Sequence, residues 1–264
     1  MVLPGWTQIR ECPGSNTTST MSDVIDREDS HEIREIRPEA WKIFCRTGMP
    51  NTSDSVENCA RSDHAVRMAR TYRRQAPLFD LTRAPVLFGR RVLADHIETG
   101  ASVLEVGCGT GHNLATLSEA AGPSGRVFGV ECAPAMLDRA RRRGLDGVEL
   151  IEAEYGVDPL PEGIAPLDAI VFSYSLSMIP EFARILHRAH SDLRNGGRIV
   201  VLDFMNSPSR LMRAWMRSFG VSLGPARTDS IAEHFSVTSC DRRPAWLGLW
   251  RYQMLVAQRV GPWT

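Results

Sequence analysis

The sequence predicts an α/β protein built on a doubly wound parallel sheet. From residue 101 onward, short apolar runs of strand length alternate with runs of helical length. Alternation at this spacing is typical of a parallel sheet with helices on both faces. A glycine-rich loop over residues 107–111 follows the first of these strands, which is where ligand-binding loops lie in such sheets.

Each element follows from its own pattern of apolar residues. Strands are expected over residues 103–106, 127–130, 148–151, 169–172 and 198–204, with helices over residues 113–121, 134–143 and 181–193. After residue 204 the alternation ends. A helix is then expected over residues 208–219, followed by an apolar segment over 231–235 and strand-like stretches over 236–241 and 250–260.

Charge and pattern divide the chain into three regions. Residues 1–60 carry ten acidic and six basic side chains with stretches rich in Ser, Thr and Asn, and we expect a partly ordered extension there. Residues 61–100 are expected to form a basic helical cap. Residues 101–264 form the predicted sheet domain.

The basic cap is expected to contain two helices. Residues 61–91 hold eight arginines against two aspartates. Ser62 or Asp63 can cap a helix that ends before Pro77, because proline disfavours helix at the residue that precedes it. A second helix is expected over residues 85–98, since proline suits a first helical turn.

Composition excludes several classes of protein. The 264 residues carry 31 basic and 31 acidic side chains, which excludes a uniformly basic nucleic-acid-binding surface. No apolar run approaches the roughly 18–20 residues of a membrane span, and the N-terminus lacks a signal-peptide pattern, so a cytoplasmic protein is expected. None of the six cysteines forms a C-x-x-C pair, so no metal site is expected.

The most informative segment reads Val-Leu-Glu-Val-Gly-Cys-Gly-Thr-Gly-His-Asn, residues 103–113. A strand runs directly into Gly107, Gly109 and Gly111, which permit a tight turn and let a ligand lie against the backbone. A dinucleotide fingerprint would need glycine where His112 stands, and a P-loop would need a following G-K-[ST]. The spacing therefore indicates a different ligand.

Three acidic residues follow three successive strands. Glu105 lies beside the glycine loop, where a carboxylate disfavours a pyrophosphate and suits an ammonium or a sulfonium. Glu131 ends the next strand, where a carboxylate can accept hydrogen bonds from both ribose hydroxyls. Glu154 follows the third strand and could accept from an adenine amino group beside the N–H of Tyr155. Together with the glycine loop, these acids predict a site for a cationic nucleoside.

Residues 101–204 resemble the class I S-adenosylmethionine-dependent methyltransferases. The resemblance implies S-adenosyl-L-methionine as cofactor and a Rossmann-like sheet of seven strands whose last, antiparallel member is the stretch over 250–260. It also implies the cofactor contacts: the methionine part at Glu105 and the loop of Gly107, Cys108, Gly109 and Gly111, the ribose at Glu131, the adenine at Glu154 and Tyr155, and a further contact at Ser173.

The flanking segments resemble a narrower group. Residues 72–83 and 87–90 before the sheet, 172–180 after the fourth strand and 196–204 are similar to the diacylglyceryl-homoserine N-methyltransferases of betaine-lipid synthesis, which belong to the ubiquinone/menaquinone methyltransferase-like group. This resemblance covers about residues 64–260 and implies successive N-methylation of an amino-lipid head group. Phe79 departs from it, because that group has tyrosine there.

Candidate residues for the acceptor lie in the cap and after the fourth strand. Tyr174, Tyr72 and Asp80 could accept from or orient an amine. An α-amino group titrates near ~8, so a strong base is not required. Arg83 and Arg90 could hold the carboxylate of the cofactor or of the head group.

The helix over residues 208–219 has two interpretations. Leu211, Trp215 and Phe219 recur every four residues among interleaved arginines. A basic amphipathic helix with Trp can lie at an anionic membrane surface, which would make the protein peripherally membrane-associated. The same stripe could instead cover the sheet or the pocket.

Other functions stay open. A C- or O-methyltransferase acting on a quinone or another small aromatic is the main alternative, with Tyr174, Phe79 and Phe172 lining an aromatic pocket. A non-catalytic cofactor-binding module that interacts through residues 1–60 is a further alternative. A nucleic-acid methyltransferase is disfavoured, because the fourth strand lacks an N-P-P-Y motif. The sequence does not indicate an oligomeric state.

Overall fold

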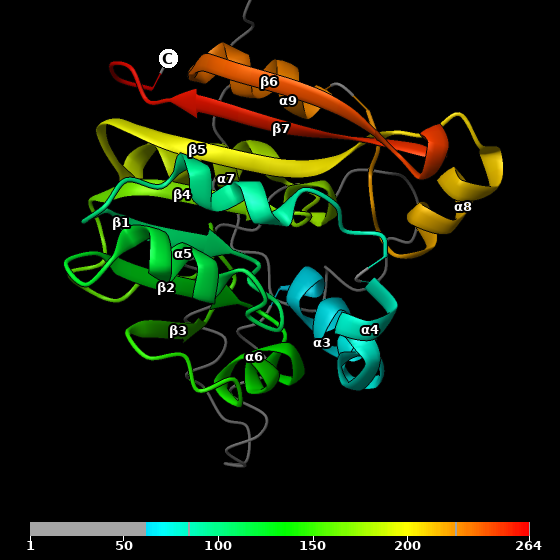
Figure 1. Cartoon of the computed structure of the whole chain (residues 1–264), viewed down its shortest axis with the longest axis horizontal. Coiled ribbons are helices and arrows are strands. Elements are labelled where there is room, and N and C mark those ends of the chain that lie inside the picture. The colour runs from blue at the N-terminus through cyan, green and yellow to red at the C-terminus, as the bar shows by residue number, and fades with distance from the viewer. Residues whose placement is uncertain (1–61, 84, 225, 264) are drawn as a thin grey trace, which may run out of the picture. The chain divides into compact units, whose positions relative to one another are not determined.

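The computed structural model describes residues 62–83, 85–224 and 226–263 (Figure 1). The predicted extension over residues 1–60 lies outside the described residues. Within the described ranges, helices pack on both faces of a single twisted sheet (Figure 1).

The sheet has seven strands in the spatial order β3-β2-β1-β4-β5-β7-β6. Their bounds are β1 (Ser102–Val106), β2 (Arg126–Glu131), β3 (Val148–Glu152), β4 (Leu167–Ser173), β5 (Leu193–Asn206), β6 (Ser236–Ala245) and β7 (Trp250–Gln258). Strands β1 to β5 run parallel, whereas β7 is antiparallel to both of its neighbours. The predicted doubly wound seven-stranded sheet with an antiparallel last strand is confirmed. Strand β6 runs past the predicted residue 241, because it pairs with β7 as far as Ala245.

The helices are α3 (Asp63–Gln75), α4 (Phe79–Arg83), α5 (Leu114–Ala121), α6 (Pro134–Arg141), α7 (Phe182–Asp192), α8 (Arg210–Ser218) and α9 (Ala226–His234). Short 3₁₀ turns are η2 (Ala76–Leu78), η3 (Arg90–His96), η4 (Leu176–Met178) and η5 (Trp246–Gly248). The predicted helices at 113–121, 134–143 and 181–193 therefore form with ends shifted by a few residues at most.

Two apolar layers hold the helices to the sheet. On one face, Leu93 of η3 and Leu117 of α5 pack with Val103 of β1. On the other, Leu186 of α7 packs with Leu104 of β1. Successive strand residues point to opposite faces, so a parallel strand covered on both sides has apolar residues throughout.

The cap differs from the prediction in its second half. Ser62 caps α3 as expected, since its hydroxyl accepts from the N–H of Ala65 at 3.1 Å. The α-helix predicted over residues 85–98 does not form, and only η3 is helical there. Gly89 has φ +81°, and a Cβ at this position would lie 2.9 Å from the ring of Tyr252. The backbone turns there and cannot continue as a helix.

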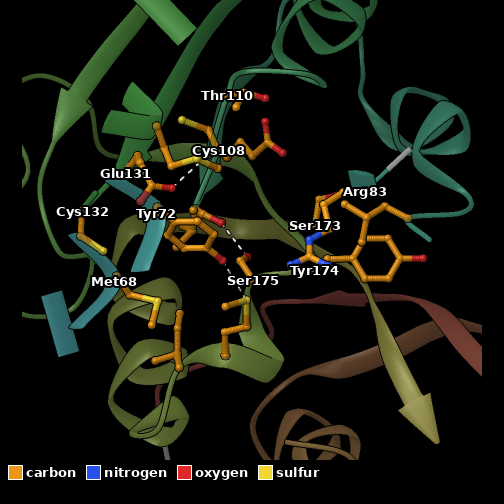
Figure 2. Close-up of a pocket in the computed structure, with 18 of the residues that line it drawn as sticks. Met68, Tyr72, Arg83, Cys108, Thr110, Glu131, Cys132, Ser173, Tyr174 and Ser175 are labelled. Carbon is orange, nitrogen blue, oxygen red and sulfur yellow. Dashed lines mark hydrogen bonds between the residues drawn. The ribbon is translucent and has the colours of Figure 1, made fainter. Parts of the chain in front are cut away.

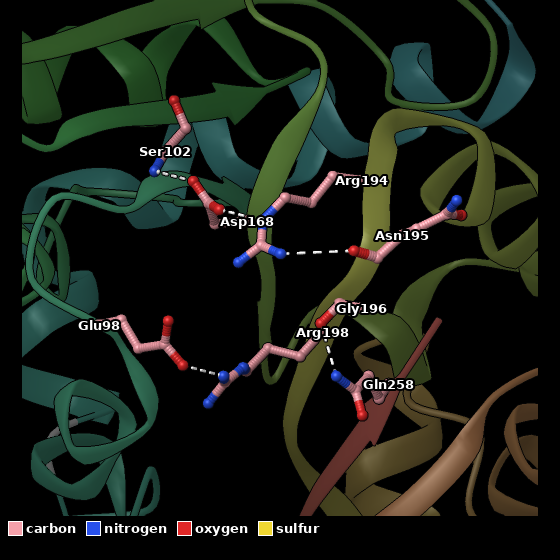
Figure 3. A network of polar contacts seen from close by, with 8 residues as sticks. All are labelled: Glu98, Ser102, Asp168, Arg194, Asn195, Gly196, Arg198 and Gln258. Carbon is pink, nitrogen blue, oxygen red and sulfur yellow. Dashed lines mark hydrogen bonds and ion pairs between the residues drawn. The ribbon is translucent and has the colours of Figure 1, made fainter. Parts of the chain in front are cut away.

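Polar contacts tie together segments at the amino ends of the parallel strands (Figure 3). Asp168 accepts from the N–H of Ser102 at 2.8 Å and pairs with Arg194. Arg198 pairs with Glu98 nearby. These contacts occupy one end of the sheet and leave its carboxyl edge for a ligand.

No helix in the described part of the chain is long and apolar enough to cross a membrane.

Candidate functional site

A deep pocket lies at the carboxyl ends of β1, β2 and β4 (Figure 2). It is bordered by the glycine loop, by α3 and α4 of the cap, and by α8. Its empty space, counted out to the solvent-filled mouth, is about 1270 Å³.

The glycine loop forms one wall through its backbone. Gly107, Gly109 and Gly111 all have φ between +59° and +73°, which L side chains rarely adopt. A Cβ on Gly107 would lie 2.8 Å from the Cβ of Ser175. The loop is thus restricted to glycine at a point where the Ser175 side chain lies against its backbone. Cys108 lies within it, buried and lining the pocket.

Glu105 is fully buried at the end of β1 and lines the pocket. Its Oε1 accepts from Nδ2 of Asn113 at 2.5 Å, and its Oε2 has no partner within the described chain. Burial raises the pKa of Glu105 to about 7, although Asn113 and the nearby Arg90 oppose the shift. A buried carboxylate with a free oxygen is suited to a cationic group.

Glu131 is held at the end of β2 by two backbone groups. Its Oε2 accepts from the N–H of Gly109 at 3.0 Å, and its Oε1 accepts from the N–H of Ala133 at 2.8 Å. Burial raises the pKa of this carboxyl, and these two hydrogen bonds oppose the shift. Since an ionised carboxylate has about four acceptor sites, both oxygens retain capacity for hydroxyl groups.

Glu154 and Tyr155 lie beyond the end of β3 and also line the pocket. The Glu154 side chain accepts from the hydroxyl of Ser62, which ties the start of α3 to this edge. Tyr155 is buried, and its hydroxyl donates to Oδ2 of Asp192 on α7 at 2.9 Å. The hydroxyl of Tyr155 is therefore directed into the fold.

The end of β4 supplies Ser173 and Tyr174 to the same pocket. The Ser173 hydroxyl is buried with no partner among the described residues. Tyr174 has φ +56°, and its hydroxyl donates to the carbonyl oxygen of Phe88 at 2.6 Å. Burial raises the pKa of Tyr174 well above its usual range, so its hydroxyl stays protonated.

The cap places Tyr72 across the pocket from Tyr174 (Figure 2). Its hydroxyl lies 3.5 Å from the sulfur of Met178. Burial raises the pKa of Tyr72 above its usual range as well. Neither predicted tyrosine is therefore an ionised base near neutral pH.

Asp80 lies outside the residues that line the pocket. It accepts from the Thr110 hydroxyl at 2.5 Å and pairs with Arg143 at 2.6 Å. These contacts link α4 to the glycine loop. Asp80 therefore holds two segments together beside the pocket, whereas the sequence predicted that it contacts the methyl acceptor.

The two predicted arginines both line the pocket. The guanidinium of Arg83 lies 4.2 Å from the ring centroid of Phe219 and 5.4 Å from that of Trp215. Arg90 is largely buried, with its Nε unpartnered in the described chain. Burial lowers the pKa of Arg90, while nearby Glu105 opposes the shift. Both guanidinium groups remain charged at neutral pH, because arginine titrates above ~12 in water.

Helix α8 covers the pocket with part of its predicted stripe. Trp215 and Phe219 line the cavity, and Leu211 is 84% exposed. The sequence left open whether this stripe covers the pocket or faces a membrane. Its two halves differ: the carboxyl half encloses the pocket and the amino half faces solvent.

Several lining residues were missed by sequence reasoning. They come from every wall of the pocket and are His64, Met68, His112, Met136, Met178, Ile179, Phe204, Met216 and Val221. His112 had a usable signal, because it directly follows the last loop glycine. His64 lies in the basic cap helix, and the others are apolar residues of the kind that form an ordinary core.

A protein-family model described as a methyltransferase domain matches residues 103–197. An aklanonic acid methyltransferase, DauC, from Streptomyces sp. (strain C5) is 36% identical over 118 residues, which is 42% of this chain and 52% of the relative. A demethylmenaquinone methyltransferase from Thermus thermophilus is 32% identical over 144 residues, or 50% of this chain and 64% of the relative. The chain thus spans less than two thirds of these relatives.

Solved structures share the fold at low identity. A geranyl diphosphate C-methyltransferase from Streptomyces coelicolor A3(2), in complex with S-adenosyl-L-homocysteine, has a TM-score of 0.56 at 18% identity, covering 65% of this chain and 79% of its own. The [4+2]-cyclase SpnF has a TM-score of 0.61 at 16% identity, covering 75% and 97%. Because the fold hosts a cyclase as well, the reaction has to be argued from the site.

Proposed function

We propose that this chain, whose residues 103–197 form a class I S-adenosylmethionine-dependent methyltransferase domain, methylates a small oxygenated ring compound at carbon or oxygen. One observation carries the proposal. A single pocket joins the glycine loop and three strand-end carboxylates to a chamber lined by aromatic rings and two arginines.

The cofactor half of the pocket fits S-adenosyl-L-methionine. The unpartnered Oε2 of Glu105 suits a cationic group, and Glu131 offers two oxygens to a ribose. Ser173 supplies a further unpartnered hydroxyl, and Glu154 lies at the adenine end. When bound, this cofactor supplies an electrophilic methyl group on a sulfonium. The family match and neighbours solved with S-adenosyl-L-homocysteine or sinefungin support the same cofactor.

The acceptor half is apolar and positively charged. Phe79, Trp215 and Phe219 surround the Arg83 guanidinium, and Arg90 also lines the pocket. Arginine binds phenolate or carboxylate oxygens through charge-assisted hydrogen bonds. An oxygenated aromatic acid or hydroquinone fits these contacts. The demethylmenaquinone and aklanonic acid methyltransferases among the relatives act on compounds of this class by their names.

An amine that becomes a quaternary ammonium fits less well. The aromatic rings could attract such a cation, but two nearby guanidinium groups repel it. The carboxylates that line the pocket are Glu105, Glu131 and Glu154, and all three follow the strands assigned to the cofactor half. Diacylglyceryl-homoserine therefore stays a predicted acceptor to be tested beside the ring compounds.

The described pocket offers no ionised tyrosine as a base. An acidic phenol loses its hydroxyl proton readily. A hydroquinone methylated at carbon loses its ring proton only after the methyl group has added, when this restores the aromatic ring. His112 lines the pocket, and burial together with Arg90 and Arg143 lowers its pKa. A neutral imidazole is therefore available as an acceptor of a proton there.

The direct test is label transfer from isotope-labelled S-adenosyl-L-methionine. The full chain is incubated separately with a demethylmenaquinol, an anthraquinone carboxylic acid and diacylglyceryl-homoserine, and products are identified by mass spectrometry. Label in either ring compound is expected. Label confined to the amino lipid would overturn the acceptor assignment, and cofactor binding without any label would overturn both classes.

Arg83→Gln tests the acceptor half separately. It should raise the KM for an anionic ring acceptor roughly tenfold, since hydrogen bonds to charged groups contribute about 1.5–3 kcal/mol. The Kd for S-adenosyl-L-methionine, measured by calorimetry, should not change. Arg74→Gln, at an exposed arginine on α3, is the matched control. An equal effect of both variants would refute a specific role for Arg83.

A further inference from the structure

An apolar surface lies beside the mouth of the pocket, at one end of the described sheet domain. Helices α4 and α8 and the turn between β6 and β7 all lie at this end (Figure 1). Together with the end of η2, they present exposed large apolar side chains, which we call the apolar rim: Leu78, Leu81, Leu211, Trp215, Trp246 and Leu247.

Contacts hold the three parts of the apolar rim together. Arg83 of α4 stacks on Trp215 and Phe219 at the end of α8. The indole N–H of Trp246 donates to the carbonyl oxygen of Pro85 at 2.6 Å. The rim is therefore one surface built by segments far apart in sequence, and monomeric proteins rarely expose a large contiguous apolar patch without a binding role.

The turn η5 adopts strained backbone to present its side chains outward. Trp246 and Leu247 have φ +45° and +54°, which is uncommon for residues other than glycine, and Leu247 is fully exposed. Strained positions cluster at functional sites, since elsewhere their cost is not offset. No packing inside the described fold accounts for this Leu.

The charge around the apolar rim is positive. From Phe204 to Thr228 the chain has four arginines and no carboxylate, and Arg210 and Arg217 of α8 are exposed. Two carboxylates on neighbouring elements are already paired, Asp80 with Arg143 and Asp241 with Arg243. Trp and Leu side chains beside arginines match the interface of an anionic bilayer, where Trp lies at head-group level.

We propose that the apolar rim docks this protein on the surface of an anionic lipid bilayer, with Leu81, Leu211 and Leu247 inserted among the lipids. Docking would turn the pocket mouth toward the bilayer, because Trp215 belongs to both the rim and the pocket lining. Delivery of an apolar acceptor from the lipid follows from this and rests on the proposed function. The docking itself does not depend on the proposed function.

The test is sedimentation of the full chain with vesicles, without cofactor or acceptor. Vesicles of phosphatidylcholine alone are compared with vesicles that also contain phosphatidylglycerol. Binding to the anionic vesicles is expected, with weakening at high salt, and tryptophan fluorescence should shift to the blue. Because no methyl transfer is measured, failure here is distinct from failure of the proposed function.

Variants distinguish binding through the apolar rim from nonspecific hydrophobic binding to vesicles. Leu247→Glu and Leu81→Glu should each weaken binding roughly tenfold or more, since each removes an inserted leucine. Arg210→Glu should also weaken it, because an arginine near an anionic surface contributes roughly fivefold and the new charge is repelled. Val260→Glu is the control at an exposed apolar residue just past the far end of β7. Thermal unfolding confirms that each variant is folded.

Three results would overturn the proposal. One is absence of binding to anionic vesicles by the full chain. Another is an equal loss of binding with Val260→Glu. The third is a lipid-free dimer, seen by analytical ultracentrifugation, that Leu247→Glu dissociates, since the rim would then contact a second copy of the chain.

Discussion

Glu105 links the stability of the fold to the negative charge that is proposed to face the cationic cofactor. Its pKa is raised from an ordinary value of 4.5 to about 7 because the side chain is fully buried. At roughly 1.4 kcal/mol per pKa unit, ionising it in the folded state costs about 3 kcal/mol of stability. That stability is fully present below a pH near 4.5 and is lost as the pH rises to about 7.

Glu105→Gln removes this ionisation while keeping the shape of the side chain. The quantity to compare is the free energy of unfolding of the variant minus that of the unchanged protein. We expect this difference to be about 2 kcal/mol larger at about pH 8 than at about pH 5. The affinity of the variant for S-adenosyl-L-methionine at about pH 8 should fall roughly tenfold or more, because an ionised partner for a cationic group is lost. The unchanged protein should bind this cofactor more weakly as the pH falls below about 7, and the variant should not.

Urea unfolding at both pH values measures the first effect, and calorimetric titration measures the second. Glu119→Gln, at an exposed carboxyl on α5, is the matched control. A stability gap between the Glu105 variant and the unchanged protein that is equal at both pH values would refute the burial argument. Unchanged cofactor affinity would refute the role of the carboxylate in binding.

Three further outcomes follow from the structure. Gly107→Ala should destabilise the fold by about 1–3 kcal/mol in urea unfolding and weaken cofactor binding, because its φ of +69° and the 2.8 Å approach to Ser175 both exclude a Cβ; a variant as stable as the unchanged protein would contradict this. Glu131→Ala should weaken cofactor binding by roughly one to two orders of magnitude in calorimetry, since charge-assisted hydrogen bonds are lost, and an unaltered Kd would remove Glu131 from the ribose site. Asp168→Asn should be less stable than the unchanged protein at neutral pH, and this difference should disappear in acid. Burial raises the pKa of Asp168, but hydrogen bonds from Ser102 and Arg194 outweigh burial and lower the pKa below its ordinary value. The stabilisation by the ionised carboxylate is therefore lost as the pH falls. A gap that persists in acid, in the same unfolding assay, would contradict this pairing.

The sequence alone determined the sheet and the carboxylates at its carboxyl edge. Each parallel strand is an apolar run, and the group that follows it lies at the carboxyl edge by topology. The sequence therefore predicts that Glu105, Glu131 and Glu154 lie along the carboxyl edge of the sheet. In the structure all three line the same pocket. The antiparallel last strand came from a family resemblance, and pairing of β7 with β5 bears it out.

The cap and the acceptor half were decided by tertiary structure. Gly89 turns the chain with a φ of +81°, and the ring of Tyr252, far away in sequence, leaves no room for a Cβ there. Asp80 pairs with Arg143 outside the pocket lining, and the Arg83 guanidinium lies over the ring of Phe219 at the end of α8.

These contacts join residues separated by tens to more than a hundred positions, so no local pattern reports them. Hydrophobic periodicity shows which face of an element is buried, but not the element against which it packs. That is why Trp215 could be read from the sequence as either a lid or a membrane residue. Only the packing of α8 on the cap places its ring over the pocket while Leu211 stays in solvent.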